Sequence, residues 1–139
     1  MAGPGSMRIS ADTNILVRAM TGDDAVQSPR AKRELVQAER VAVTASALCE
    51  LVWVLRRAYR VSPASIAAEI RHLVSTSNVE VDRPVVGAGL AQLDAGGDFA
   101  DGVIAHEGRC LGAETFVSFD RQAVERLRAQ GHDARLPAE

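Results

Sequence analysis

The sequence contains few of the residues that build zinc sites and disulfide frameworks. Its 139 residues include 2 cysteines and 3 histidines, and His72, His106 and His132 are too irregularly spaced for a zinc motif. Cys49 and Cys110 stand among apolar neighbours, which favours two reduced core thiols, with a single disulfide as the alternative. This cysteine usage favours an intracellular, cytoplasmic protein.

Long apolar runs and an excess of positive charge are also missing. The most apolar stretch, Val41–Leu55, is too short for a membrane span and is interrupted by Thr44, Ser46 and Glu50. The net charge of −2 argues against a surface dedicated to broad attraction of nucleic acid, but it leaves room for a local basic patch. We therefore expect a soluble protein without a membrane segment.

Lysine is almost absent, because Lys32 is the only one. A phospho-accepting receiver domain, which is also an α/β fold with an acidic pocket, needs a lysine late in the chain, so this class is disfavoured. A haloacid-dehalogenase-like phosphatase is disfavoured as well, because Thr13 and Asn14 follow Asp12 where that class requires a second aspartate.

Short strand patterns alternate with helix patterns along the chain. The expected strands are residues 8–11, 41–44, 79–81 and 115–119. The expected helices begin after Asn14, at Ala25 or Pro29, after Thr44 or Ser46, at Pro63, at Pro84, near Asp101 and at Arg121. This alternation indicates an α/β fold with a mostly parallel sheet. We interpret residues 1–6 as the remnant of an expression tag, 7–135 as a single domain and 136–139 as a tail.

Four aspartates stand at or near the starts of expected helices: Asp12, Asp98, Asp101 and Asp120. Taken singly, each is explained by helix capping or by a favourable interaction with the helix dipole. Asp12 and Asp120 also follow expected strands, however, and in a parallel sheet such positions lie along one edge, where ligands bind. The acids can therefore converge.

Glu50 lies too far inside its expected helix to serve as a cap, and apolar residues surround it. Because an uncompensated buried charge is heavily penalised, Glu50 pairs with an arginine such as Arg18, is protonated, or shares a cation with the other acids. Hard oxygen ligands without cysteine or suitably spaced histidine select Mg²⁺ or Mn²⁺. The acids thus predict a divalent metal site suited to phosphodiester hydrolysis.

Four segments resemble the acidic motifs of PIN-domain ribonucleases. They are Asp12-Thr-Asn-Ile-Leu16, Leu48-Cys-Glu-Leu51, Phe99-Ala-Asp-Gly-Val-Ile-Ala105 and Ser118-Phe-Asp120. Their order and spacing match the family over essentially all of the chain from residue 7 to 135. More narrowly, the chain is similar to VapC-type toxins of bacterial type II toxin–antitoxin pairs.

The resemblance implies a three-layer α/β/α sandwich and assigns roles to individual residues. The implied metal-binding carboxylates are Asp12, Glu50, Asp101 and Asp120, with Asp98 as an auxiliary acid. Thr13, Asn14 and Ser118 would orient the site, and Ser46 would support it with a hydroxyl. Gly102 and His106 depart from the small aliphatic residues that are usual there. Gly102 and Gly108 each weaken the helix by roughly 1 kcal/mol relative to alanine.

The implied activity is that of an endoribonuclease, in which one or two Mg²⁺ or Mn²⁺ ions activate water and no covalent enzyme intermediate forms. The implied partners are the RNA substrate, a second copy in a homodimer, and a VapB-like antitoxin that covers the site. The alternative is a PIN-fold module that binds RNA or protein and has a catalytically silent metal site.

Overall fold

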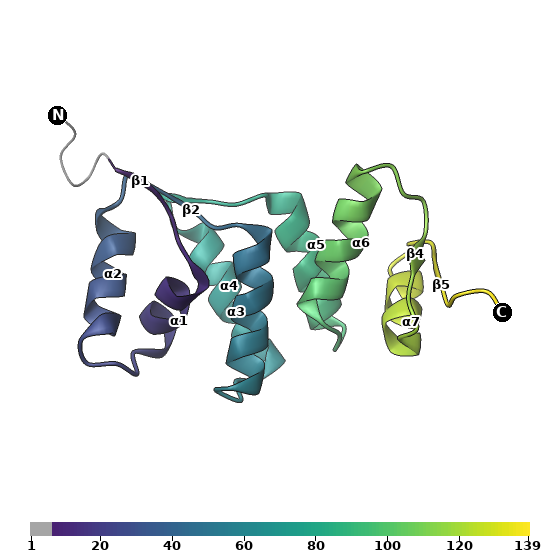
Figure 1. Ribbon diagram of the computed structural model, residues 1–139, viewed down its shortest axis with the longest axis horizontal. Coiled ribbons are helices and arrows are strands. Elements are labelled where there is room, and N and C mark those ends of the chain that lie inside the picture. The colour runs from purple at the N-terminus through teal and green to yellow at the C-terminus, as the bar shows by residue number, and fades with distance from the viewer. Residues whose placement is uncertain (1–6) are drawn as a thin grey trace. The chain divides into compact units, whose positions relative to one another are not determined.

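The computed structural model describes residues 7–139, and this part of the chain forms two compact units that divide between Asp82 and Arg83 (Figure 1). The interpretation of residues 1–6 lies outside the described residues. The single domain over residues 7–135 stays a prediction, and residues 136–139 carry no helix or strand.

The first unit contains a three-stranded parallel sheet with helices between its strands. Its elements are β1 (Arg8–Ser10), α1 (Thr13–Thr21), α2 (Gln27–Gln37), β2 (Arg40–Ala42), α3 (Ala45–Arg57), α4 (Pro63–Ser75) and β3 (Val79–Glu80). The strands are hydrogen-bonded in the order β1-β2-β3, with Ile9 opposite Val41 and Val41 opposite Val79. The expected parallel α/β arrangement is confirmed for these elements.

Capping residues set the starts of α3 and α4. The hydroxyl of Thr44 accepts a hydrogen bond from the Ala47 amide at 3.1 Å, and Ser62 caps α4, which begins with Pro63. Each cap satisfies a backbone N–H that the first helical turn leaves without a partner. The position of Glu50 inside α3 follows from the start that Thr44 fixes.

Helix α3 is buried along one face only. Leu48, Leu51 and Leu55 are almost completely buried, whereas Glu50 is exposed and Trp53 is 62 % exposed. The sequence-based expectation that apolar residues enclose Glu50 is therefore wrong. A stripe of leucine and valine at helical spacing is enough to pack one side of α3, and the opposite side carries Glu50.

The second unit contains three helices and two short parallel strands: α5 (Arg83–Asp94), α6 (Phe99–Cys110), β4 (Phe116–Val117), α7 (Arg121–Ala129) and β5 (Ala134–Arg135). Strand β5 falls in a segment for which the sequence predicted no strand. Its Ala134 is buried against Val124, Leu127 and Ala105, which ties the end of the chain to α6 and α7.

Neither cysteine forms a disulfide, as expected, but Cys110 is exposed at the end of α6 and is not a core thiol. Within residues 7–139, every helix is too short or too polar to cross a membrane.

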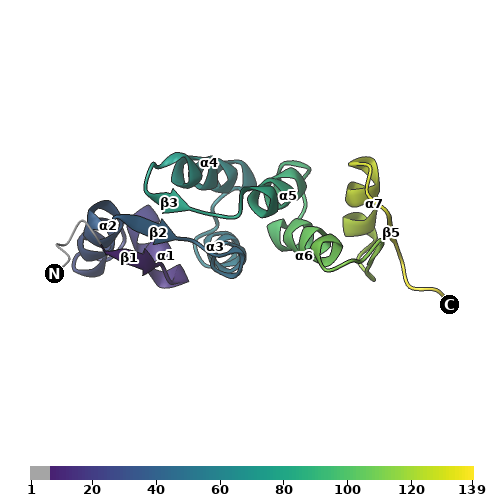
Figure 2. The same ribbon diagram turned by 90° about the horizontal axis from the view of Figure 1, so that it is seen from above.

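Glycines allow α5 and α6 to pack closely, and the two helices lie side by side in both views (Figure 2). A Cβ atom at Gly102 would overlap the backbone carbonyl of Ala88, and one at Gly89 would overlap the ring of Phe99. Helix propensity alone counts Gly102 as a weakness of α6. The packing against α5 instead requires that this position have no side chain.

We expect Gly102→Ala to lower the free energy of unfolding by about 1–3 kcal/mol, because the added methyl group meets backbone that must shift. The matched control is Gly87→Ala in α5, where an added Cβ meets nothing within 4 Å. This control should gain up to about 1 kcal/mol through helix propensity. Urea unfolding followed by circular dichroism measures both, and equal stability of the two variants would contradict the packing argument.

Candidate functional site

The carboxyl ends of β1 and β2 both lead into helices that carry acidic residues. Strand β1 ends at Ser10, and Asp12 then caps α1 by accepting a hydrogen bond from the Thr13 amide at 2.8 Å. Strand β2 ends at Ala42 and is followed by α3 with Glu50. Because the two strands are parallel neighbours, Asp12 and the start of α3 lie at the same edge of the sheet.

Thr13 links Asp12 to Glu50. Its hydroxyl donates a hydrogen bond to Glu50 Oε2 at 2.7 Å, and its side chain is only 7 % exposed. Of the alternatives for Glu50, an ion pair with Arg18 is not formed, since Arg18 pairs with Asp23. The fixed Thr13 hydroxyl therefore orients the Glu50 carboxylate beside Asp12.

Two openings expose this acidic pair. A cavity of about 380 Å³ is lined by Asp12, Thr13, Glu50, Ser46 and Thr44, among others. A second cavity of about 590 Å³ runs between α1 and α3, and Asp12, Thr13 and Glu50 line it as well. Ser46 and Asn14, both predicted as site residues, thus lie beside the acids. The sequence predicted only the start of a helix at Thr44, and no place for it in the site.

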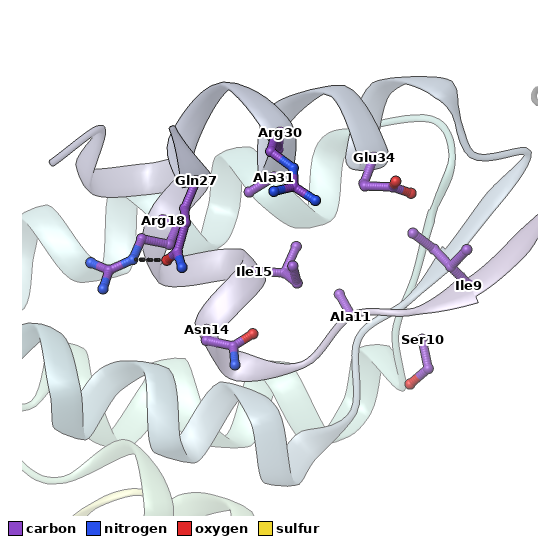
Figure 3. A pocket seen from close by; sticks show the side chains of 10 residues that line it. All are labelled: Ile9, Ser10, Ala11, Asn14, Ile15, Arg18, Gln27, Arg30, Ala31 and Glu34. Carbon is purple, nitrogen blue, oxygen red and sulfur yellow. Dashed lines mark hydrogen bonds between the residues drawn. The ribbon is translucent and has the colours of Figure 1, made fainter. Parts of the chain in front are cut away.

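A cavity of about 710 Å³ lies between β1, α1 and α2 (Figure 3). Its floor is apolar, with Ile9, Ile15 and Ala31, and its only acid is Glu34. Asp12 and Glu50 do not line it. This cavity is larger than the two that Asp12 and Glu50 line. A hard metal ion needs carboxylate ligands, however, so the smaller cavities are the better candidates for a metal site.

A hydrogen-bond network joins α1 to the turn that follows α3. Arg18 Nη1 donates to Asp23 at 3.0 Å and to the Tyr59 hydroxyl at 3.2 Å, and Tyr59 donates to Asp23 at 2.6 Å. The Tyr59 hydrogen bond, followed by those from Thr21 and Arg18, lowers the pKa of Asp23 to about 2. The sequence offered no indication of this network, since Asp23 lies in a loop without periodic pattern.

The second unit brings together Asp98, Asp101 and Asp120. Asp98 caps α6 by accepting from the Ala100 amide at 3.2 Å, and Asp120 caps α7 by accepting from the Gln122 and Ala123 amides. The Ser118 hydroxyl accepts a hydrogen bond from the Asp120 amide at 3.0 Å. The capping explanation is correct for Asp98 and Asp120, and Asp101 lies in the first turn of α6.

The three carboxylates of this unit repel one another. Burial raises the pKa of Asp101 above its ordinary value, the negative charges of Asp98 and then Asp120 raise it further, and Arg126 opposes them. Ionised Asp101 is therefore disfavoured in the folded protein. A bound cation would relieve this repulsion.

The donor chemistry fits a hard divalent cation. Within residues 7–139, no group of three or more histidine, cysteine or acidic side chains is arranged to hold a metal ion. Magnesium, however, keeps several waters and binds proteins through one or two carboxylates together with substrate phosphate. Asp12 and Glu50, which Thr13 joins, match that requirement, and the absence of cysteine and histidine beside them disfavours zinc.

Parallel strands that lead into carboxylate-bearing helices define an α/β protein with an acidic site. The PIN domain family model matches residues 9–129, and the chain belongs to this family. PIN domains are generally nucleases that use divalent metal ions, and membership in this family points to a nuclease-type function. No curated protein matches the chain. The narrower resemblance to VapC-type toxins stays a prediction.

The pKa of Asp23 predicts a pH-dependent effect of Tyr59→Phe. Since the folded-state pKa is about 2 and the ordinary value is 3.8, the stabilisation is complete above 3.8 and is lost as pH falls towards 2. Tyr59→Phe should therefore lower Tm at about pH 6, and the difference from wild type should shrink between about pH 4 and pH 2. Thermal unfolding across this range measures it.

The control is the same substitution in an Asp23→Asn background, where Tyr59→Phe should no longer carry a pH-dependent cost. A Tm difference that stays constant from about pH 6 to pH 2 would contradict the role of Asp23.

Proposed function

We propose that the protein is a divalent-metal-dependent endoribonuclease that uses Mg²⁺ or Mn²⁺ and whose metal-binding carboxylates are Asp12, Glu50, Asp101 and Asp120. The observation that carries this proposal is that Thr13 donates hydrogen bonds to both Asp12 and Glu50, which fixes two exposed carboxylates at the opening of a cavity. The family membership of the chain supplies the reaction class.

The protein's own groups prepare the site before RNA arrives. The Thr13 amide holds Asp12, the Thr13 hydroxyl holds Glu50, and Ser118 fixes the backbone at Asp120. Asn14 and Ser46 line the openings beside the acidic pair, where they would orient the phosphate. A site whose ligands are already held by hydrogen bonds needs little reorganisation during the reaction.

Hydrolysis adds water across one phosphodiester bond and leaves a hydroxyl on one product and a phosphate on the other. A bound divalent ion would lower the pKa of water and stabilise negative charge on the phosphate. Asp98, which is exposed beside Asp101, would position the attacking water or accept its proton.

The toxin role is the finer part of the proposal. The order and spacing of the four acidic motifs support a VapC-type toxin that forms a homodimer, is neutralised by a VapB-like antitoxin and acts in the cytoplasm. The second candidate, a PIN-fold module that binds RNA or protein with a silent metal site, differs from this proposal in having no activity.

Metal binding tests the site directly. Mg²⁺ or Mn²⁺ should raise the Tm of the wild-type protein, because a ligand that binds only the folded state stabilises it. Asp12→Asn and Glu50→Gln should lose most of this increase. Glu69→Gln, which removes an acid from α4 beside a different cavity, should keep it. An unchanged metal response in both folded site variants would refute the proposed ligands.

Activity separates the two candidate functions. Purified protein should cleave single-stranded RNA with Mg²⁺ or Mn²⁺ and not with EDTA, and Glu50→Gln should lower cleavage by at least about a hundredfold. Metal-dependent stabilisation without RNA cleavage would favour the silent module. Cleavage that persists in EDTA would contradict the metal-dependent mechanism.

A further inference from the structure

Helices α1 and α3 form a groove whose two ends are fixed by hydrogen bonds. At one end Thr13 donates to Glu50 at 2.7 Å, and at the other end Arg18 donates to Tyr59 at 3.2 Å. The cavity of about 590 Å³ between these contacts is lined by both helices. We call it the α1–α3 groove.

The α1–α3 groove changes in character along its length. Asp12 and Glu50 line the end at the sheet edge, while Val17, Val54 and Ala58 provide an apolar wall farther along. A volume of this size suits a ligand of small-molecule dimensions. It accommodates an unstacked nucleotide and is too small for a double helix.

Two arginines flank the residues that line the far end of the groove, since Arg57 precedes Ala58 and Arg60 follows Tyr59. Arg57 follows Glu50 by seven residues, which places both on the same side of α3, about 10 Å apart along the helix axis. Arg56 lies about 120° away from Glu50 around the helix axis. Arg56 and Arg57 are both exposed, and the positive charge of each interacts favourably with the negative end of the helix dipole. The two arginines therefore differ only in the side of α3 on which they lie.

The positive charge of Arg57 and Arg60 is available to a ligand. Arg18 is committed to Asp23, but none of the ion pairs among residues 7–139 involves Arg56, Arg57 or Arg60. These three side chains are exposed. Because Arg57 and Arg60 flank Ala58 and Tyr59 of the groove lining, they are the arginines without an ion pair, in the described part of the chain, next to its far end.

Arg60 occupies a backbone conformation that favours glycine. Its φ is 55°, and it is the only non-glycine residue among residues 7–139 with a positive φ. It lies three residues after the end of α3, in the turn that the hydrogen bond from the Val61 amide to the Leu55 carbonyl closes at 2.9 Å. Glycine is the usual residue at such a helix end. An arginine there carries a conformational cost that a role of its side chain would explain.

We propose that the α1–α3 groove holds the single-stranded RNA segment next to the cleaved phosphate, with Arg57 and Arg60 contacting phosphates of that segment. This inference rests on the nuclease function proposed above. A basic end that tracks the backbone, together with an apolar wall for a base, is the arrangement by which proteins bind single strands without strong sequence preference.

RNA binding in EDTA tests the groove separately from cleavage. Fluorescence anisotropy with a labelled single-stranded oligoribonucleotide should show binding roughly three- to tenfold weaker for Arg57→Ala and for Arg60→Gly. Each of these two substitutions removes one phosphate contact, so the slope of log affinity against log salt concentration should become less steep by about 0.7. Arg56→Ala removes the same charge from another side of α3 and should change neither quantity.

Arg60→Gly also separates binding from folding. Since glycine suits the positive φ, this variant should have a Tm equal to or above that of wild type while it binds RNA less tightly. Weaker binding accompanied by a lower Tm in both variants would overturn the assignment of these arginines to RNA contact.

The remaining outcomes distinguish this inference from the proposed function. If wild type cleaves RNA but all three arginine variants bind equally, the groove assignment fails and the nuclease function stands. If Arg57→Ala and Arg60→Gly bind RNA weakly but wild type does not cleave, the groove stands and the nuclease function fails. Tighter binding of a poly-glutamate peptide than of RNA of equal charge would favour an acidic protein partner and overturn the inference.

Discussion

The hydrogen bond from Thr13 to Glu50 connects the two elements that define the acidic site of the first unit. Thr13 is the first residue of α1 and is held by its place after β1, while Glu50 is held by α3. Two neighbouring carboxylates at one sheet edge repel each other, so a contact that orients them is needed to keep them together. With it, one buried hydroxyl fixes Glu50, and the neighbouring amide fixes Asp12. The proposed metal site and the α1–α3 groove both start from this contact.

Much of the fold could be predicted from the sequence because local rules decide its elements. Thr44, Ser62, Asp98 and Asp120 are helix caps, and the strands before α1 and α3 are short β-branched or alternating segments. Strand β5 was missed because two residues carry no pattern, and they form a strand through hydrogen bonds to β4, with Ala134 buried against α6 and α7. Gly102 was misjudged for a related reason: propensity describes one helix, whereas its value comes from the neighbouring helix α5.

The candidate site was predictable in its acids but not in their environment. The resemblance to the acidic motifs and the need to compensate Glu50 indicated that Asp12 and Glu50 belong together. The sequence could not tell that Glu50 is exposed, because apolar residues on one face of α3 resemble burial all around. Nor could it predict that Asp23, a loop residue, would take Arg18 away from Glu50. Long-range hydrogen bonds of this kind depend on how loops close, and no sequence periodicity records that.

The central claim is that Thr13 makes a metal-binding pair of Asp12 and Glu50, and Mn²⁺ affinity measured by isothermal titration calorimetry tests it most directly. Groups that orient metal ligands typically contribute ten- to a hundredfold to affinity. Thr13→Val keeps the shape of the side chain but removes the hydroxyl, and it should weaken Mn²⁺ binding at least about tenfold. Thr13→Ser should bind nearly as wild type. Equal Mn²⁺ affinity of Thr13→Val and wild type would contradict the account.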